Sequence, residues 1–126
     1  MSDAPPILLW LRRDFRLSDH PALSAAVASG RPIVPVFIRD SEVDALGAAP
    51  KWRLGLGLAK HEKALANCGS HLVLRTGAPL ACLQSLIEET GATSVYWSRL
   101  YDPSSIARDQ EVKETLKSRG IEARSF

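Results

Sequence analysis

Residues 7–19 read Ile-Leu-Leu-Trp-Leu-Arg-Arg-Asp-Phe-Arg-Leu-Ser-Asp, and the predicted fold is arranged around them. The apolar run Ile7–Leu11 is short and uninterrupted, which is typical of a strand buried inside a parallel sheet. Four charged side chains follow at the predicted end of this strand: Arg12, Arg13, Asp14 and Arg16. Ligands of open α/β sheets bind beyond the carboxyl ends of strands near the topological switch point. We therefore expect binding or chemistry first at this cluster.

The composition indicates one ordinary globular domain over residues 1–126. The hydrophobic fraction is 45% and the charged fraction 24%, and the net charge of +2 is too small to indicate nucleic-acid binding by itself. No apolar run approaches the roughly 20 residues that cross a bilayer, and the first residues lack the basic and apolar regions of a signal peptide. Cys68 and Cys82 stand apart without a Cys-x-x-Cys motif, so neither a disulfide framework nor a zinc site is expected. We expect a cytoplasmic, reducing location and no membrane contact.

Apolar runs and helical periodicity alternate along the chain. Strands are predicted at residues 7–11, 32–38, 71–75, 94–97 and 121–124. Helices are predicted from Ser18 or Asp19 to Gly30, over 51–67 and 79–90, and from Asp102-Pro103 to Gly120. This alternation predicts an α/β, Rossmann-like, doubly wound five-stranded parallel sheet of order 3-2-1-4-5, with helices on both faces. In that order, residues 11–14 face residues 98–102 across the switch point.

Local features refine these elements. The residues expected to face inward from the first two helices are Leu23, Ala26 and Val27, then Leu54, Leu58 and Leu65. Residues 41–50 are rich in small side chains and are predicted to form a mobile loop. Pro35 lies inside the second strand, where it removes a ladder donor, so a bulge or a locally unpaired amide is expected there.

Motifs of nucleotide-binding and hydrolytic enzymes are absent. Residues 55–60 (Gly-Leu-Gly-Leu-Ala-Lys) imitate a dinucleotide fingerprint, but they lie inside a predicted helix and carry Lys60 where the third glycine is needed. The sequence contains no P-loop motif and no Gly-x-Ser-x-Gly nucleophile elbow. His20, His61 and His71 are dispersed without metal-ligand spacing, so each is expected to be a surface or helix-start residue. No catalytic residue and no metal ligand is predicted.

Three charged or aromatic clusters keep both a structural and a binding interpretation. Asp14 can bind a neighbouring arginine and hold the first loop in place, while the remaining arginines bind a ligand. Residues 51–53, a tryptophan between two cations, suit a planar anion or form a solvated first helical turn. Asp102 is expected to cap the next helix, and Trp97 and Tyr101 line either a flat pocket or the core.

Five stretches resemble the opening of DNA photolyases and cryptochromes. They are residues 9–23 (Leu-Trp-Leu-Arg-Arg-Asp-Phe-Arg-Leu-Ser-Asp-His-Pro-Ala-Leu), 35–40 (Pro-Val-Phe-Ile-Arg-Asp), 51–54 (Lys-Trp-Arg-Leu), 71–77 (His-Leu-Val-Leu-Arg-Thr-Gly), and 95–103 with Arg108-Asp109. The match runs through nearly the whole chain, in order and at family-like spacing. The resemblance implies the N-terminal α/β domain, which holds the antenna chromophore in this family.

The resemblance also implies a longer parent protein. A helical C-terminal domain, absent from residues 1–126, would bind FAD and receive damaged DNA. The parent would be a deoxyribodipyrimidine photo-lyase that repairs cyclobutane pyrimidine dimers by light-driven electron transfer from reduced FAD. The present domain would pack on its own FAD domain, remain monomeric and perform no bond chemistry. A cryptochrome photoreceptor, which signals without catalysis, is the first alternative, and a stand-alone nucleotide-binding module is the second.

The ends of the predicted strands, combined with the resemblance, suggest which residues line the antenna crevice. They are Arg13, Phe37, Arg39, Asp40, Lys51, Arg53, Leu100 and Asp102. The candidate antennas are 8-hydroxy-5-deazaflavin, methenyl-folate and flavin. Ser104 and Ser105 stand where folate-binding members carry Asn-Glu, and Leu100 stands where deazaflavin-binding members carry Asp, so the antenna's identity stays open. The resemblance also favours a structural role for residues 12–16, with Asp14 held by an arginine.

Overall fold

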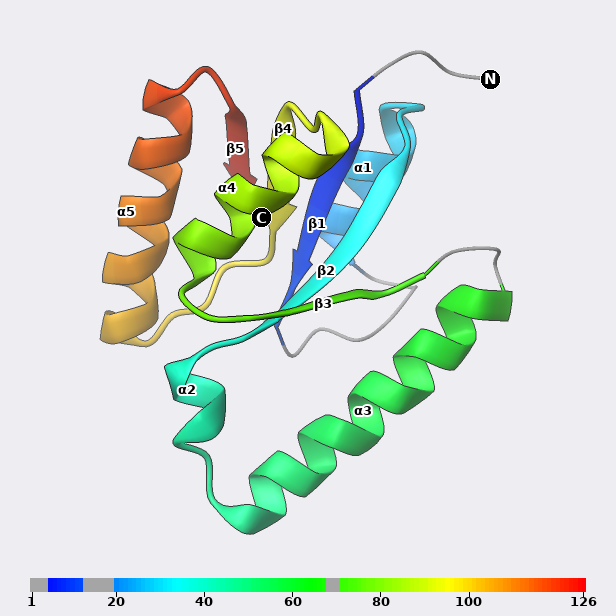
Figure 1. Ribbon diagram of the computed structural model, residues 1–126, viewed down its shortest axis with the longest axis vertical. Helices are drawn as coiled ribbons and strands as arrows, with labels where there is room; N and C mark the ends of the chain where they lie inside the picture. Colours follow the sequence, from blue (N-terminus) through cyan, green and yellow to red (C-terminus); the bar gives the residue numbers. More distant parts are fainter. Residues whose placement is uncertain (1–4, 13–19, 68–70) are drawn as a thin grey trace.

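The centre of the molecule is a five-stranded parallel sheet in the order β3-β2-β1-β4-β5 (Figure 1). A computed structural model describes residues 5–12, 20–67 and 71–126. The strands are β1 (Ile7–Leu11), β2 (Ile33–Arg39), β3 (Val73–Thr76), β4 (Ser94–Trp97) and β5 (Glu122–Ser125). The predicted fold class and strand order are confirmed, and the observed strand limits differ from the predicted ones by at most two residues.

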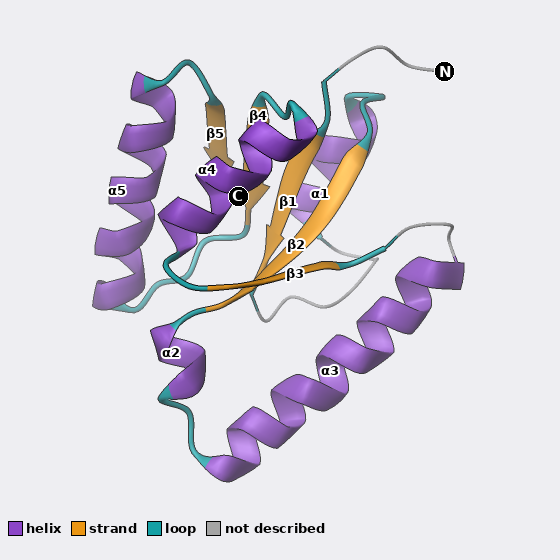
Figure 2. Ribbon diagram, viewed as in Figure 1, coloured by secondary structure: helices purple, strands orange, loops and turns teal. Residues whose placement is uncertain are grey.

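Helices cover both faces of this sheet (Figure 2). α4 (Pro79–Thr90) and α5 (Pro103–Ser118) pack on one face. α1 (Pro21–Ala28) and α3 (Ala48–Asn67) pack on the other, and the short α2 (Ser41–Asp44) follows β2. Within the described ranges, no helix combines the length and the apolar character that crossing a membrane requires.

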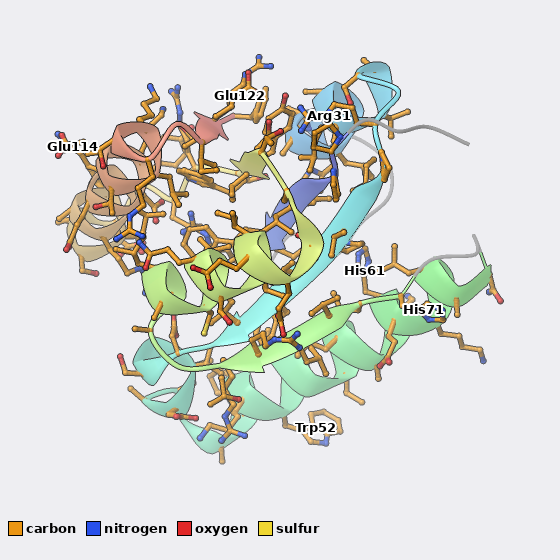
Figure 3. The ribbon with its side chains drawn as sticks, turned by 45° about the horizontal axis from the view of Figure 1, so that its top comes forward. Arg31, Trp52, His61, His71, Glu114 and Glu122 are labelled. Atoms are coloured by element: carbon orange, nitrogen blue, oxygen red, sulfur yellow. The ribbon has the colours of Figure 1, made fainter. Side chains whose placement is uncertain are left out.

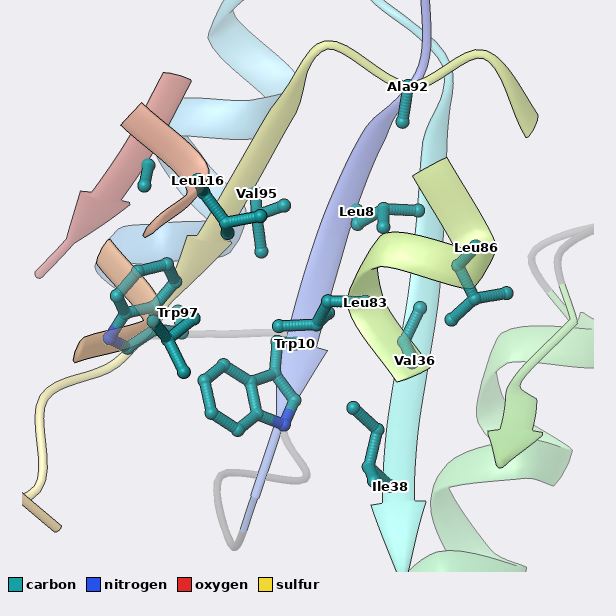
Figure 4. Packing of buried hydrophobic residues seen from close by; sticks show 12 residues of the cluster. Leu8, Trp10, Val36, Ile38, Leu83, Leu86, Ala92, Val95, Trp97 and Leu116 are labelled. Carbon is teal, nitrogen blue, oxygen red and sulfur yellow. The ribbon is translucent and has the colours of Figure 1, made fainter. Parts of the chain in front are cut away.

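The strand β1 is buried along its whole length. Successive residues of a strand point to opposite faces, so Leu8 and Trp10 join the cluster under α4 and α5, while Leu9 joins the cluster under α1 and α3. Trp10 meets Trp97 of β4 edge to face, with ring centroids 5.6 Å apart (Figure 4). Burial on both faces explains why the sequence of β1 is an uninterrupted apolar run.

The N-terminus of α1 is capped by His20 rather than by Ser18 or Asp19, which lie outside the described residues. The Nδ1 atom of His20 accepts a hydrogen bond from the backbone N–H of Leu23 at 3.1 Å. His20 is therefore a helix-start residue, as predicted, although it is also buried. His71 is exposed, as predicted.

Two predictions about helix faces are wrong. Val27 is 61% exposed, because the smaller Ala22 and Ala26 form the buried side of α1. His61 is buried inside α3 rather than on the surface, because the helical period places it on the same stripe as Leu65. Figure 3 shows His61 on the side of α3 that faces the sheet.

Residues 41–50 contain helical structure, so the prediction of a simple loop is wrong. Asp40 caps α2, since its Oδ1 accepts a hydrogen bond from the backbone N–H of Val43 at 3.0 Å. α3 then begins at Ala48, three residues before the predicted start at Lys51. The short carboxylate side chain of Asp40, at the end of β2, therefore caps the additional helix α2.

Pro35 is accommodated without a bulge. The register between β1 and β2 is continuous and pairs Leu9 with Pro35. The carbonyl of Pro32 accepts a hydrogen bond from the N–H of Ile7, on the β1 side of β2, and the carbonyl of Arg39 accepts one from the N–H of Gly77, on the β3 side. Backbone groups of successive residues point to alternate sides of a strand, so the odd-numbered residues of β2, including Pro35, face β3. Pairing with β3 begins only at Val36. The missing N–H therefore falls where the ladder has not yet started, which confirms the locally unpaired amide.

The cap of α1 can be tested by substitution. His20→Ala should lower the free energy of unfolding by about 1–2 kcal/mol, because the Leu23 N–H loses its acceptor. His20→Asn should retain part of this stability, since an amide oxygen accepts the same bond. Urea denaturation measures both, and Ser24→Ala, an exposed change in the same helix, should stay within about 0.5 kcal/mol of the parent. Equal losses for His20→Ala and His20→Asn would contradict the capping role.

Candidate functional site

A cavity of about 420 Å³ opens at the carboxyl ends of β1, β2 and β4, beside the first turns of α5. Its walls combine apolar and charged side chains. They are Trp10, Leu11, Arg12, Phe37, Ile38, Asp40, Val43, Leu46, Leu54, Leu100, Asp102, Ser104, Ser105 and Arg108. β1 and β4 are neighbours in the sheet, while the helices that follow them cover opposite faces. The cavity therefore lies at the topological switch point, as the strand order predicts.

Arg12 forms the base of this cavity directly after β1. Its Nη2 lies 2.7 Å from Oδ2 of Asp109, and both side chains are largely buried, with 7% and 13% of their surfaces exposed. The guanidinium also lies over the ring of Trp10, 4.1 Å from its centroid. A buried cation needs such partners, because it has lost its hydration. The contact fastens the exit of β1 to α5.

Asp40 and Arg108 form a second ion pair, which connects the end of β2 to α5. Nη1 of Arg108 donates to Oδ2 of Asp40 at 2.9 Å, and the other carboxylate oxygen of Asp40 caps α2. The Arg108 side chain is 22% exposed, so part of its guanidinium remains accessible at the cavity wall. These bonds hold the width of the cavity between β2 and α5.

Asp102 caps α5, which confirms the predicted structural role. Its Oδ2 accepts hydrogen bonds from the backbone N–H of Ser105 at 3.1 Å and from the hydroxyl of Ser104 at 2.9 Å. The hydrogen bonds from Ser105, followed by that from Ser104, lower the pKa of Asp102 from 3.8 to about 2. The carboxylate is therefore charged at neutral pH and already engaged by the helix.

The structure brings together half of the residues that the sequence suggested. Phe37, Asp40, Leu100 and Asp102 line the cavity. The other four are not found in the cavity lining. Arg39 is exposed and forms an ion pair with Asp44 at 2.6 Å, and Lys51 donates a hydrogen bond to the carbonyl of Asp44 at 3.1 Å. Arg53 is exposed, and Arg13 lies outside the described residues. The proposed contact of Asp14 with an arginine also lies outside them.

Two cations of the cavity wall were missing from the suggested set. Arg12 belongs to the charged cluster after β1, but sequence position alone did not distinguish it from the next arginine. Asp102, Ser105 and Arg108 follow one another at intervals of three residues, and residues at this spacing share one side of a helix. This spacing could have identified Arg108 from the sequence, once Asp102 was recognised as the cap of α5.

The cavity has the chemical character of a small-molecule binding site. Large apolar side chains form much of its lining. The charged groups are two arginines held by carboxylates, Arg12 and Arg108, and the carboxylates of Asp40 and Asp102. Among the residues that the structure describes, no group of three or more His, Cys, Asp and Glu side chains could hold a metal ion. The volume falls in the range of small-molecule sites, about 300–1,000 Å³, and such walls favour a planar ligand with polar edges.

Known proteins are similar to this chain in sequence and in fold. The family model described as DNA photolyase matches residues 7–126. A deoxyribodipyrimidine photo-lyase of Agrobacterium fabrum is 44% identical over 96% of this chain and 25% of its own length. Cryptochrome-1 of Sinapis alba is 38% identical over 100% of this chain and 26% of its own length. The chain therefore spans about a quarter of these relatives.

Solved structures agree. The crystal structure of a bacterial class III photolyase from Agrobacterium tumefaciens superposes with a TM-score of 0.95 at 42% identity, covering 100% of this chain and 26% of that one. A cryptochrome from Synechocystis gives a TM-score of 0.85 at 27% identity, covering 100% of this chain and 28% of that one.

The buried pair of Arg12 and Asp109 can be tested by a double-mutant cycle. Arg12→Met should cost about 3–5 kcal/mol of unfolding free energy, because it leaves the carboxylate of Asp109 buried and uncompensated. Combining it with Asp109→Leu should recover part of this loss. The exposed pair of Arg39 and Asp44 supplies the control, since Arg39→Met should cost no more than about 1 kcal/mol. A loss at Arg12 as small as that at Arg39 would contradict the account.

The cap Asp102 predicts a pH dependence. A carboxylate with a lowered folded-state pKa stabilises the fold above its unfolded pKa, and this contribution disappears as the pH falls toward the folded value. The difference in unfolding free energy between the parent and Asp102→Asn should therefore shrink from pH 5 to pH 2, across the interval from 3.8 to about 2. Denaturation at each pH measures it. A difference that stays constant would show that Asp102 does not titrate there.

Proposed function

This chain belongs to the DNA photolyase family, and from that premise we propose that it forms the N-terminal antenna-chromophore domain of a longer deoxyribodipyrimidine photo-lyase. The parent protein would repair cyclobutane pyrimidine dimers in damaged DNA with light. The observation that carries this proposal is the 44% identity with a photo-lyase over 96% of the chain, together with the TM-score of 0.95 against a photolyase structure.

Proteins of this family bind FAD and an antenna chromophore. We place FAD outside residues 1–126, because relatives are about four times longer than this chain. We place the antenna in the cavity at the ends of β1, β2 and β4. The lining supports this choice, since apolar side chains from β1, β2, α2 and α3 surround the buried guanidinium of Arg12 and the accessible guanidinium of Arg108.

The side chains of the cavity would divide the work of holding a planar chromophore. Phe37 and Leu100 would contact the ring faces and exclude water, while Arg108 would donate hydrogen bonds to polar atoms at a ring edge. Asp40 would keep that guanidinium oriented, since it already binds it at 2.9 Å. When bound, the chromophore would supply light absorption for the parent protein. No residue of this chain takes part in bond making or breaking.

Several finer points belong to the same proposal. The antenna would be 8-hydroxy-5-deazaflavin, methenyl-folate or a flavin, which differ in absorption and can be distinguished after extraction. The parent would act as a monomer in the cytoplasm, and this domain would pack on its own FAD domain. Ser104 donates its hydroxyl to the cap Asp102, so a chromophore that contacts it would approach this oxygen as a hydrogen-bond donor.

The second candidate is a cryptochrome photoreceptor, which the identity of 38% with a plant cryptochrome favours. The two functions differ in light-dependent repair. The full-length protein carrying this chain should restore thymine-dimer DNA under blue light and leave it unrepaired in the dark. Absence of repair in the light, with FAD bound and reduced, would support the cryptochrome function.

The location of the antenna can be tested separately. Leu100→Arg would place a long cation at the cavity wall, so the full-length variant should bind its antenna roughly tenfold more weakly while keeping its FAD. Leu56→Arg, at a position of α3 that is 51% exposed, is the matched control and should leave both chromophores unchanged. Absorption spectra and chromophore extraction measure the ratios. An unchanged antenna content in Leu100→Arg would place the antenna elsewhere.

A further inference from the structure

A second cavity, of about 350 Å³, lies on the other side of the Arg12–Asp109 pair. It is bounded by the end of β4, the loop that follows, the first half of α5 and the end of β5. Arg12 lines the first cavity and Asp109 the second, so this ion pair separates the two, and Leu100 borders both. Apart from Leu100, none of the described residues that line the second cavity belongs to the proposed antenna site.

Two cations meet at this cavity, and the carboxylate that also lines it, that of Asp109, is already paired with Arg12. Nε of Arg99 and Nζ of Lys113 each lie 3.1 Å from the same atom, the hydroxyl oxygen of Ser125. Neither cation forms an ion pair with a carboxylate among the described residues. Burial, followed by the charges of Lys117 and Arg99, lowers the pKa of Lys113. Two positive charges sharing one neutral oxygen favour the arrival of an anion.

A buried donor also borders this cavity. The side chain of Trp97 is 1% exposed, and its Nε1 has no hydrogen-bond acceptor among the described residues. Trp97 is the register partner of Ser125, so both side chains leave the sheet on the same face. Figure 4 shows the indole nitrogen on the side away from Trp10. A buried N–H without an acceptor is unfavourable, and an anionic oxygen in this cavity would satisfy it.

Exposed apolar side chains form another part of the wall, beside the polar Asp109 and Gln110. Tyr101 is 79% exposed and Ile106 is 48% exposed, and both line the cavity. An exposed phenol ring and a branched aliphatic side chain can cover the two faces of a small aromatic ring. The cations and the indole N–H stand beside this apolar surface rather than apart from it.

We propose that this second cavity binds a small aromatic anion, a planar ring that carries a phosphate or a carboxylate group. The anionic oxygens accept hydrogen bonds from Arg99, Lys113 and Nε1 of Trp97, and the ring lies against Tyr101 and Ile106. The site is distinct from the cavity at the ends of β1 and β2, and Leu100 is the one described residue that lines both.

Phenyl phosphate is the probe for this site, with NMR as the measurement. Its addition to the full-length protein that carries this chain should shift the indole N–H signal of Trp97 in a saturable manner. Inorganic phosphate and phenol, which each supply half of the contacts, should bind at least about tenfold more weakly. Benzoate as a further ligand distinguishes the carboxylate from the phosphate as the preferred anion.

Substitution of Lys113 completes the test. Lys113→Met should weaken phenyl phosphate binding about tenfold or more, and Lys113→Arg should restore part of it. Lys60→Met, an exposed lysine of α3, is the matched control and should leave binding unchanged. The proposal is overturned if Lys113→Met binds as the parent does, or if phenyl phosphate shifts only Trp52, which is exposed on α3.

Discussion

Burial of β1 is the constraint on which the other features depend. Both edges of this strand are hydrogen-bonded, to β2 and to β4, and both faces are covered by helices. Its backbone and side chains therefore admit only an apolar sequence, and the chain becomes polar where it leaves the sheet at Arg12. The helices that follow β1 and β4 cover opposite faces of the sheet, so the chain segments that leave these two strands diverge and a crevice remains between them. The position of the first cavity therefore results from the strand order rather than from any particular side chain.

The buried charges determine how wide that opening is. The guanidinium of Arg12 loses its hydration at the end of β1, and contacts with Asp109 and the Trp10 ring compensate for the lost water. Asp40 and Arg108 form a second such ion pair at the end of β2. Both pairs reach α5, so the helix is held at two points over the carboxyl edge. Buried pairs contribute little net stability relative to apolar residues. Both pairs connect strand ends to α5, and the Arg12–Asp109 pair also lies between the two cavities.

Membership in the DNA photolyase family gives these features a context. The chain spans about a quarter of the relatives it matches, and its described residues form the walls of two cavities. The second cavity adds a distinct set of donors, Arg99, Lys113 and Trp97, on the α5 side of the sheet.

The fold class, the Asp102 cap and the family could be predicted from the sequence, because apolar period, capping chemistry and spacing are local properties. The strand order is not local, and it was predicted as the simplest topology that right-handed crossovers allow. The sequence also pointed to Phe37, Asp40, Leu100 and Asp102, since strand ends are visible in a pattern. Only the tertiary structure decided that Arg12 joins Asp109, that Arg108 joins Asp40, and that Arg39 turns to Asp44. These partners lie up to 97 residues apart, and a charge in a sequence carries no information about which distant opposite charge packing will bring within reach.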